Sequence, residues 1–442
     1  MKNKWLIASI LIVILVMLFV AIIYLSWQGL DQARQSGVRW RIFANDIVSA
    51  ESDEEQRFSA DGPTTLDLKN DIGNVTIQAG TADEIVIKAH KTAWGSNQAD
   101  AEATLENLKV IATQDDNNVT VRVEPIDTVY AFAFRARPDS VAFTITVPVN
   151  TTLLTQSNFG DIALSNTTGD ANLQTEFGDI SVTNTSGSLT VDTNSGKITA
   201  QEIQADGQLI DLRSEFGSIS LEEATAGNIN THSNSGELKL GNIEVTGDIT
   251  LGSEFGRIQF KSGKADMLSI EANSGAIILT DLVIEKPLTT NTEFGDITLL
   301  NVDAPSYDLK SNSGKVSLDG ARGNVKAHSE FGDIEVINGE QVTLDLQTNS
   351  GSVEYSGSLG SGPHTLKTEF GNIDLTIPDD TSLAINLETE FGKVKSDFAI
   401  TLNGEFSEKQ LSGTINEGGA RLTASTNSGN IAISILDQKE KK

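Results

Sequence analysis

The sequence predicts an all-β fold, a right-handed β-solenoid (β-helix) of about 14 coils of ~19 residues each. The main observation is a recurring phrase: Glu-Phe-Gly or Asn-Ser-Gly, one variable residue, and then Ile, Leu or Val. Its glycines follow one another at intervals of 18 to 21 residues from Gly160 to Gly392. A fixed period of this length indicates units that bury their apolar faces only by stacking on one another. The phrase glycines are Gly160, Gly178, Gly196, Gly217, Gly236, Gly256, Gly275, Gly295, Gly314, Gly332, Gly351, Gly371, Gly392 and Gly429.

Apolar and polar residues alternate after each phrase glycine. The second residue after it is aliphatic, as at Ile258 and Ile297, and the third is often polar, as at Lys239 and Gln259. This period of two is typical of a strand with one buried face. Another apolar residue five positions before the glycine marks a second strand. Each unit is therefore expected to hold at least two short strands, with a sharp bend at the phrase where glycine permits an unusual φ.

Two other repeat architectures compete with this interpretation. A helical solenoid disagrees with repeats rich in Thr, Ile, Val, Gly and Asn. A β-propeller uses four strands per blade over about 40 residues, which two phrases together would supply. One coil per phrase fits the near-identical phrases better. At ~4.7–4.9 Å per coil, it predicts a rod on the order of 65–70 Å long.

Residues 61–150 lack the regular phrase and are expected to cap the open end of the rod, because an uncovered strand edge invites aggregation. Residues 71–75 resemble a degenerate copy of the phrase. One short helix is expected to begin at Ser96 as its N-cap, with Ala101, Leu105 and Leu108 near one face. Strand patterns occur at 66–68, 75–77, 85–87, 119–123 and 141–147.

Residues 5–27 form an apolar stretch without charge, long enough to cross a hydrocarbon core of roughly 30 Å as a transmembrane helix. Trp5 and Trp27 stand where interfacial aromatic residues belong. A cleavable signal peptide is the alternative, but it would have a shorter apolar core and small residues at a cleavage site. We expect an uncleaved single-pass anchor in the cell membrane, with residues 1–4 as a cytoplasmic tail and the C-terminal bulk extracytoplasmic.

The remaining segments complete the expected organisation. Residues 28–60 are polar and predict a solvated linker. The repeats are expected to run without a break over 151–436, with a degenerate copy at 412–415, and a charged tail follows at 437–442.

Composition excludes several classes of function. There are 61 acidic and 32 basic residues, a formal charge of −29. Such acidity argues against nucleic-acid binding, which relies on Lys and Arg, and against adsorption to anionic lipid. The chain has no cysteine, so disulfides, thiolate zinc sites and cysteine nucleophiles are excluded. No cofactor is expected.

The two residues before the phrase glycine alternate between Glu-Phe and Asn-Ser in successive coils. Carboxylates in adjacent coils, ~4.8 Å apart, would repel by about 0.9 kcal/mol even in bulk water. Asparagine between them doubles the spacing, and serine leaves room for each phenyl ring. The alternation is broken at Phe159/Phe177 and at Phe370/Phe391.

The alternative interpretation of this column is a carboxylate ladder of ~9.6 Å period that binds Ca²⁺ or a periodic polymer. Calcium takes six to eight oxygen ligands per site, and the aspartate-rich nonapeptide of calcium-binding β-rolls does not occur. We therefore expect no metal site. The ladder would consist of Glu176, Glu215, Glu254, Glu293, Glu330 and Glu369.

Catalytic residues are not expected, because almost all acidic side chains belong to the repeat and none stands out. His232 and His328 both lie four positions before a phrase glycine, five coils and about 24 Å apart. One segment departs from the acidic surface and is either a hairpin packed on the cap or a contact site for the membrane or a partner. It contains Tyr130, Phe132, Phe134, Arg135 and Arg137.

The phrase, the Thr-Ile-Thr-Val-Pro-Val segment at 144–149 and the N-terminal anchor together resemble the bacterial putative-adhesin β-strand-repeat family. The resemblance covers about 61–436. It implies a membrane-anchored β-repeat protein of the cell envelope and assigns no functional residues.

We expect a non-catalytic, membrane-anchored extracytoplasmic β-solenoid that acts as a cell-envelope scaffold or adhesin-like binding surface. Its partners would be its own membrane through residues 5–27, and an envelope polymer or another envelope protein. The alternative is a carbohydrate-active β-helix enzyme, a polysaccharide lyase or hydrolase.

Overall fold

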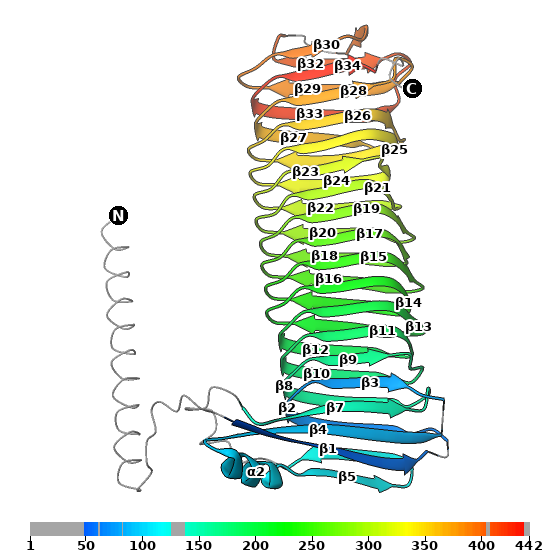
Figure 1. Ribbon diagram of the computed structural model, residues 1–442. Coiled ribbons are helices and arrows are strands. Elements are labelled where there is room, and N and C mark those ends of the chain that lie inside the picture. The colour runs from blue at the N-terminus through cyan, green and yellow to red at the C-terminus, as the bar shows by residue number, and fades with distance from the viewer. Residues whose placement is uncertain (1–47, 61, 82, 125–137, 404–406, 437–442) are drawn as a thin grey trace, which may run out of the picture.

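A computed structural model describes residues 48–60, 62–81, 83–124, 138–403 and 407–436. They form a right-handed β-solenoid with one helix, in which coils stack into a tall rod closed at both ends by antiparallel strands (Figure 1). The predicted all-β class is confirmed. The predicted anchor at 5–27 and the tails at 1–4 and 437–442 lie outside the described residues. Within the described part, no helix has the length and apolarity needed to cross a membrane.

The regular part of the rod is built from parallel strands, each paired with the equivalent strand one coil away. Strands before and after the phrase alternate along the chain, and some continue round a bend into the next segment. They are β8 (Thr152–Phe159), β9 (Ile162–Ser165), β10 (Ala171–Phe177), β11 (Ile180–Ser186), β12 (Leu189–Ser195), β13 (Ile198–Ser214), β14 (Ile219–Ser233), β15 (Leu238–Val245), β16 (Asp248–Ser253), β17 (Ile258–Ala265), β18 (Met267–Ala272), β19 (Ile277–Ile284), β20 (Leu288–Thr292), β21 (Ile297–Asp303), β22 (Ser306–Ser311), β23 (Val316–Asp319), β24 (Arg322–Ser329), β25 (Ile334–Thr348), β26 (Val353–Leu359), β27 (His364–Phe370) and β28 (Ile373–Ile377).

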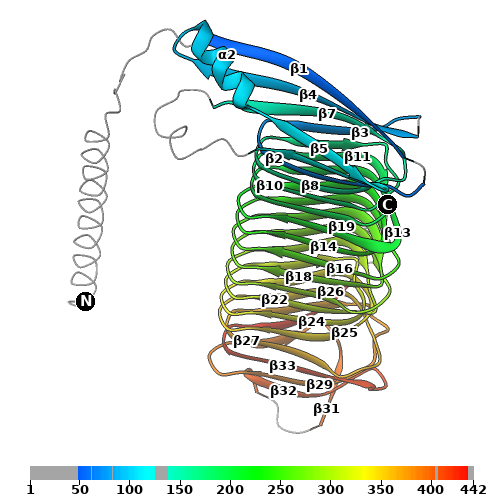
Figure 2. The same cartoon turned by 90° about the horizontal axis from the view of Figure 1, so that it is seen from below.

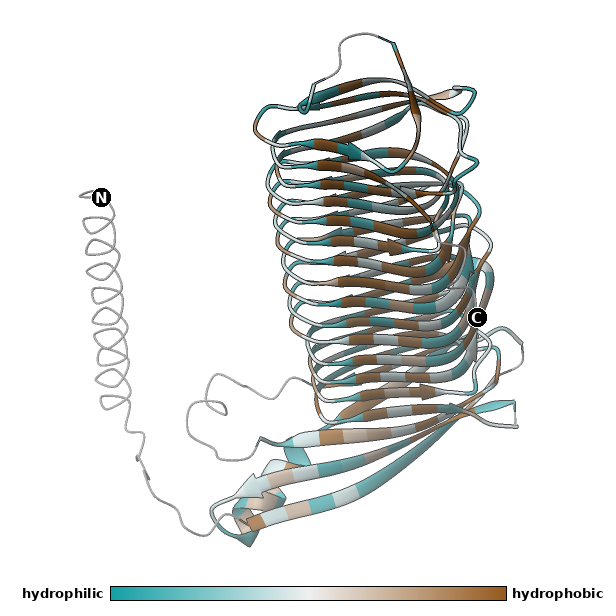
Figure 3. Cartoon of the chain, turned by 90° about the horizontal axis from the view of Figure 1, so that it is seen from above, coloured by the Kyte–Doolittle hydropathy of each residue, from teal (hydrophilic) through white to brown (hydrophobic). Residues whose placement is uncertain are grey.

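The core of the rod is a continuous column of aliphatic side chains. Ile258 and Ile297, two residues after their phrase glycines, are fully buried, while Lys239 faces solvent. Apolar bands therefore recur at the same place in coil after coil (Figure 3). The inside and outside positions predicted from the alternation are confirmed.

The phrase glycines are required by close stacking and not by an unusual φ, which corrects the expectation from sequence. Among the phrase glycines only Gly160 has a positive φ, +154°. A Cβ on Gly256 would lie 1.8 Å from the carbonyl oxygen of Gly236 in the coil below, and the same approach recurs up the column. Real Cβ atoms do not come so near backbone, so only glycine fits.

Buried hydroxyl groups line this glycine column from inside. The residue three positions before most phrase glycines is Ser or Thr, and in most coils its hydroxyl donates to the carbonyl of the phrase glycine one coil below. Ser329 Oγ donates to Gly314 O at 3.0 Å, and Thr348 Oγ1 donates to Gly332 O at 2.9 Å. A buried carbonyl thus gains a partner.

A second bend, six residues after each phrase glycine from Gly160 to Gly332, was not anticipated. The residue there adopts a left-handed conformation with φ between 51° and 62°, and Gly320 takes the same place with φ 87°. Asn, Asp and Gly tolerate this region best, and the run of Asn and Asp at this position is the signal that the sequence analysis missed. The members are Asn166, Asn184, Glu202, Glu223, Asn242, Ser262, Asp281, Asn301 and Asn338.

The expected count of 14 coils in chain order is wrong, and about 11 turns follow in order. The glycine column climbs from Gly160 to Gly371, but then Gly429 stacks on Gly371 and Gly392 stacks on Gly429. The last part of the chain is therefore inserted beneath an earlier part. The strands involved are β29 (Leu383–Thr389), β30 (Val394–Ser396), β31 (Ile400–Leu402), β32 (Gln410–Ile415), β33 (Ala420–Ser428) and β34 (Ile431–Ile435).

Strand pairing explains this insertion. β33 lies between β27 and β29, parallel to both, and β34 pairs with β28 and β30. The segment at 412–415, expected as a degenerate coil, belongs to β32, which runs antiparallel to β29 and covers the end of the stack. A strand edge left open there would invite further pairing.

The N-terminal cap closes the other end of the rod, as Figure 2 shows from below. β2 (Thr65–Ile72) and β3 (Val75–Ala79) form a coil with Gly73 against Gly160, so the degenerate phrase predicted at 71–75 is confirmed. The remaining cap elements are β4 (Glu84–Gly95), β5 (Val110–Asp115), β6 (Asn118–Val123), β7 (Ser140–Val147) and the helix α2 (Gln98–Asn107).

The helix lies where expected, but its N-cap is Asn97 and not Ser96. Asn97 Oδ1 accepts a hydrogen bond from Asp100 N at 3.0 Å, while the Ser96 hydroxyl donates to the Asp100 carboxylate at 3.2 Å. Both residue types cap helices well, so the sequence alone did not separate neighbouring candidates. Ala101 and Leu108 are buried as predicted.

Part of the predicted linker at 28–60 is a strand. β1 (Val48–Ser59) pairs antiparallel with β4. Its residues are mostly polar, and its pairing is supported by charge: His90 Nδ1 lies 2.8 Å from Asp53 Oδ1, and Arg57 Nη1 lies 2.8 Å from Glu84 Oε1. Hydrophobic alternation is absent from such an edge strand, so the sequence pattern did not reveal it.

A substitution of Gly256 by Ala tests the stacking constraint. We expect Gly256→Ala to lower the free energy of unfolding by about 1–3 kcal/mol, because the added methyl group meets backbone that cannot move aside. Arg257→Ala, at the variable position next to it, is the control and should change stability within about 0.5 kcal/mol. Chemical denaturation measures both, and equal small effects would contradict close stacking as the reason for glycine.

The left-handed bend gives a prediction of opposite sign. Glu223→Asn should raise the free energy of unfolding by about 0.5–1 kcal/mol, because asparagine tolerates φ 57° better than glutamate does. The matched control is Gln201→Asn. Gln201 lies in strand β13, one position before Glu202, which is the bend residue equivalent to Glu223 in another coil. This control should bring no gain, and a gain of equal size there would argue against backbone conformation as the cause.

Candidate functional site

One long edge of the rod carries a column of exposed phenylalanines, which we name the phenylalanine edge. Each stands just before a phrase glycine. Their exposed fractions are 51–77 %, high for a large apolar side chain, and the column follows the bends at which the phrase lies. The edge consists of Phe177, Phe216, Phe255, Phe294, Phe331, Phe370 and Phe391.

The phenylalanines alternate with serines in space without the break that the sequence shows at Phe370/Phe391. Because β33 is inserted, Ser428 pairs with Phe370, and Phe391 N donates to Asn427 O of the same inserted strand at 2.9 Å. From Phe177 to Phe391 the spatial order is therefore Phe, Ser, Phe, Ser throughout. Two phenylalanines of the edge are two coils, or ~9.6 Å, apart.

Neighbouring coils can accommodate two phenylalanines, so lack of room does not explain the alternation. Phe159 and Phe177 occupy adjacent coils and stack, with ring centroids 5.0 Å apart and planes inclined by 6°. Stacking lowers their exposed fractions to 37 % and 51 %, whereas the five rings from Phe216 to Phe370 expose 62–67 %. Alternation therefore leaves apolar rings in contact with water and forgoes the stability that stacking would add, which favours a binding role.

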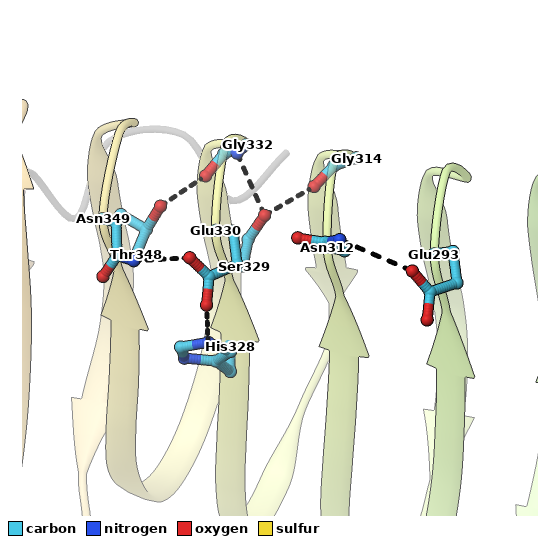
Figure 4. A network of polar contacts seen from close by, with 9 residues as sticks. All are labelled: Glu293, Asn312, Gly314, His328, Ser329, Glu330, Gly332, Thr348 and Asn349. Atoms are coloured by element: carbon cyan, nitrogen blue, oxygen red, sulfur yellow. Dashed lines mark hydrogen bonds and ion pairs between the residues drawn. The ribbon is translucent and has the colours of Figure 1, made fainter. Parts of the chain in front are cut away.

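A column of alternating Glu and Asn runs beside the phenylalanine edge. Asn349 Nδ2 donates to Glu330 Oε2 in the adjacent coil at 2.6 Å, and Asn312 donates to Glu293 at 3.5 Å (Figure 4). Asn194, Asn234 and Asn273 bond in the same way to Glu176, Glu215 and Glu254. The strand register sets Asn427 beside Glu369. The six predicted ladder glutamates therefore lie in one column, each with an asparagine as its neighbour.

Aspartates at the variable phrase position have a structural task. Asp161 Oδ1 accepts from Asp179 N at 2.9 Å, Asp179 Oδ1 accepts from Lys197 N at 2.7 Å, and Asp333 Oδ1 accepts from Ser352 N at 2.8 Å. Each carboxylate satisfies a main-chain donor of the next coil. Within the described residues, no three His, Asp or Glu side chains converge as metal ligands.

The histidines are dispersed. His232 and His328 lie on the surface, 3.0 Å from Asn234 Oδ1 and 3.5 Å from Glu330 Oε1 respectively. His364 is buried, and its Nδ1 accepts from Leu344 N at 3.3 Å while Nε2 lies 3.1 Å from Gly360 O. Burial lowers the pKa of His364, with the Gly360 carbonyl acting in the opposite direction. These histidines support strands and pair with repeat residues.

The aromatic and basic segment considered as a partner contact, with Tyr130, Phe132, Phe134, Arg135 and Arg137, lies outside the described residues. The phenylalanine edge, in contrast, was visible in the sequence as an alternation, but its exposure was not deduced. The signal that could have predicted this exposure is a bulky ring directly before the glycine at which each coil bends.

The chain belongs to the family described as Toastrack DUF4097, which matches residues 64–264 and 261–434. The resemblance to a putative-adhesin β-repeat family is thereby confirmed. A comparison with curated proteins gives no match.

Two solved structures share limited similarity with this chain. A putative adhesin from Bacteroides fragilis is 16 % identical, with 66 % of this chain and 97 % of that chain covered and a TM-score of 0.27. A putative cell adhesion protein from Clostridium sporogenes is 10 % identical, with 88 % and 100 % covered and a TM-score of 0.18. At these scores neither similarity identifies a ligand for this chain.

The asparagine spacers give a prediction with a defined pH dependence. Asn234→Glu with Asn273→Glu should create a run of adjacent carboxylates with Glu215, Glu254 and Glu293 and lower the melting temperature at pH 7. Repulsion in the folded state raises the pKa of the introduced groups, so the loss is present at pH 7 and disappears as the pH falls towards about 4. Thermal unfolding followed by circular dichroism measures it.

Asn234→Gln with Asn273→Gln is the matched control and should show no such pH dependence. Millimolar calcium should restore little of the stability lost by the double Glu variant. If calcium instead raises the melting temperature of the unmodified protein by many degrees, the glutamate column is a cation site.

Buried His364 predicts a second pH effect. Because its pKa is lower in the folded chain than in the unfolded chain, its contribution to stability should be lost as the pH falls below about 6.5. His364→Gln should reduce this dependence between pH 7 and pH 5, and surface His232→Gln should leave it in place. Denaturation across this range compares the variants, and identical profiles for unmodified and His364→Gln protein would refute the assignment.

Proposed function

We propose that the chain is a single-pass membrane protein whose extracytoplasmic β-solenoid acts, without catalysis, as a cell-envelope scaffold or adhesin-like binding surface. The phenylalanine edge supports this proposal most directly. It offers seven apolar rings along one side of the rod, each more exposed than the other large apolar side chains of the described residues. Large apolar side chains exposed repeatedly along one face are typical of interaction sites. An envelope polymer or another envelope protein is the class of partner.

The charge-free apolar stretch at 5–27 supports the anchor. Its length suits a span of the hydrocarbon core. The N-terminal end of the rod would then lie nearest the membrane, and the phenylalanine edge would extend away from it. This arrangement suits a binding surface held outside the cell.

The tasks of the acidic side chains support a non-catalytic role. Asp179 and Asp333 accept from main-chain N–H groups of the next coil, and Glu330 accepts from Asn349. A glycosidase needs two carboxylates at a set separation, one of them with a raised pKa. Carboxylates committed to holding coils together are unsuited to that task.

Fractionation tests the anchor. We expect the full-length chain to remain in membranes washed with high salt, because the span at 5–27 is held by apolar burial and not by charge. Protease added outside intact cells should digest the repeats. Recovery of a soluble chain that begins near residue 34 would show instead that the apolar stretch is a cleaved signal.

Adhesion tests the surface. Cells that display Phe255→Ser with Phe294→Ser should adhere about tenfold or more weakly to envelope material and to one another than cells with the unmodified chain, because anchoring rings dominate binding. Val283→Ser with Leu300→Ser is the control, since both side chains are exposed away from the edge. Equal adhesion of the two double variants at matched display levels would overturn the proposed role of the edge.

A further inference from the structure

We propose that the phenylalanine edge binds a second copy of this chain, with the two rods side by side, antiparallel and offset by one coil. The inference rests on the proposed function, because it names the occupant of the same surface. It follows from the spatial alternation of large and small side chains, which is complementary to itself.

The order of large and small side chains along the edge is the same from either end. From one end of the edge to the other it contains 13 levels, which are Phe177, Ser195, Phe216, Ser235, Phe255, Ser274, Phe294, Ser313, Phe331, Ser350, Phe370, Ser428 and Phe391. A two-fold axis perpendicular to the rod and placed between two levels near its middle brings six of the seven Phe of one copy opposite the six Ser of the other. Each of these rings then enters the space above a serine, as the close packing of protein interfaces requires.

The neighbouring column obeys the same symmetry. A two-fold axis of this orientation keeps each column on its own side of the contact, so the Glu/Asn column of one copy lies along that of the other. The offset of one coil sets Glu254 and Glu293 opposite asparagines and not opposite glutamates. Carboxylates are thereby kept apart between two chains that each carry a formal charge of −29.

The exposed area suits a dimer. The seven rings, at 51–77 % exposure, together present on the order of 700–1,100 Å². Stable interfaces bury about 800 Å² per partner. An isologous two-fold contact uses the same edge on both copies, so the assembly stops at two.

Other occupants fit less well. Two parallel rods related by an axis along the rod would bring ring opposite ring and leave gaps at the serines. An extended β-1,4-linked glycan has a repeat near the ~9.6 Å spacing of the rings, but it needs polar groups for its hydroxyls. The adjacent Asn349 and Glu330 already bond to each other. A second copy requires no free polar groups.

Antiparallel pairing has a consequence for the proposed scaffold or adhesin role. The N-terminal ends of the two rods lie at opposite ends of the pair. With each chain anchored through residues 5–27, the pair joins rods that arise from two facing membranes. The edge is then a homotypic contact between cell surfaces.

Mass measurement of the full chain in nanodiscs, one chain per disc, tests the pairing. We expect the unmodified protein to associate in pairs of discs in light scattering. Phe255→Ser with Phe294→Ser should weaken pairing about a hundredfold or more, and Val283→Ser with Leu300→Ser should leave it unchanged. Pairing that survives loss of the two rings overturns the inference.

Single cysteines define the direction, since the chain has none of its own. Ser195→Cys and Ser428→Cys chains, mixed and treated with a short bis-maleimide, should cross-link to each other and not to themselves. Near the centre, Ser274→Cys or Ser313→Cys should cross-link to itself. Self-cross-linking at Ser195→Cys would show parallel rods and overturn the arrangement.

The outcomes separate this inference from the proposed function. Unmodified chains that stay single, yet lose retention on insoluble chitin or cellulose when Phe255 and Phe294 are replaced, would make the edge a glycan-binding surface. The binding function would then stand and the homotypic contact would fall. If the chains stay single and the same substitutions leave adhesion unchanged, both the homotypic contact and the proposed binding function of the edge are refuted.

Discussion

The close approach of one phrase glycine to the next determines the rest of this structure. With no side chain at these positions, the carbonyl of Gly236 comes where a Cβ of Gly256 would lie, and the contact recurs up the column. Because every coil must return to this point, the residues before and after it are brought to the same height and side in each coil. The hydroxyl ladder, the aliphatic core and the outer columns all depend on that register.

Because all coils share one register, the residues at a given repeat position form a column along the rod. The order of residue types at that position therefore becomes a pattern on the surface. At the position before the glycine, Phe and Ser could have been mixed in any order, since Phe159 and Phe177 show that adjacent rings stack well. Strict alternation gives up that stacking and leaves the rings from Phe216 to Phe370 more than 60 % exposed. Folding alone gains nothing from this pattern, so binding is the better account of it.

The regular coils could be predicted from the sequence because the period of two and the phrase spacing are local signals. Ile258 inside and Lys239 outside follow directly from them. The insertion of β33 could not be predicted, since any coil with a phrase can stack on any other, and the choice depends on which pairs cover the end. β1 was missed because its pairing depends on Asp53, Arg57 and their partners, not on apolar alternation. For the candidate site, the column of phenylalanines could be predicted from the sequence, but the exposure of their rings could not.

The inserted strand bears on how the alternation is maintained. If alternation reflected only duplication of a two-coil unit, it would follow the order of the chain, and Phe391 would stack directly on Phe370. Instead the chain passes over this level, and Asn427 and Ser428 return to fill it. In chain order the alternation of Phe and Ser is interrupted between Phe370 and Phe391, but in space it continues because Ser428 lies between them. Alternation is therefore a property of the assembled surface, as a partner that contacts every level of the edge would require.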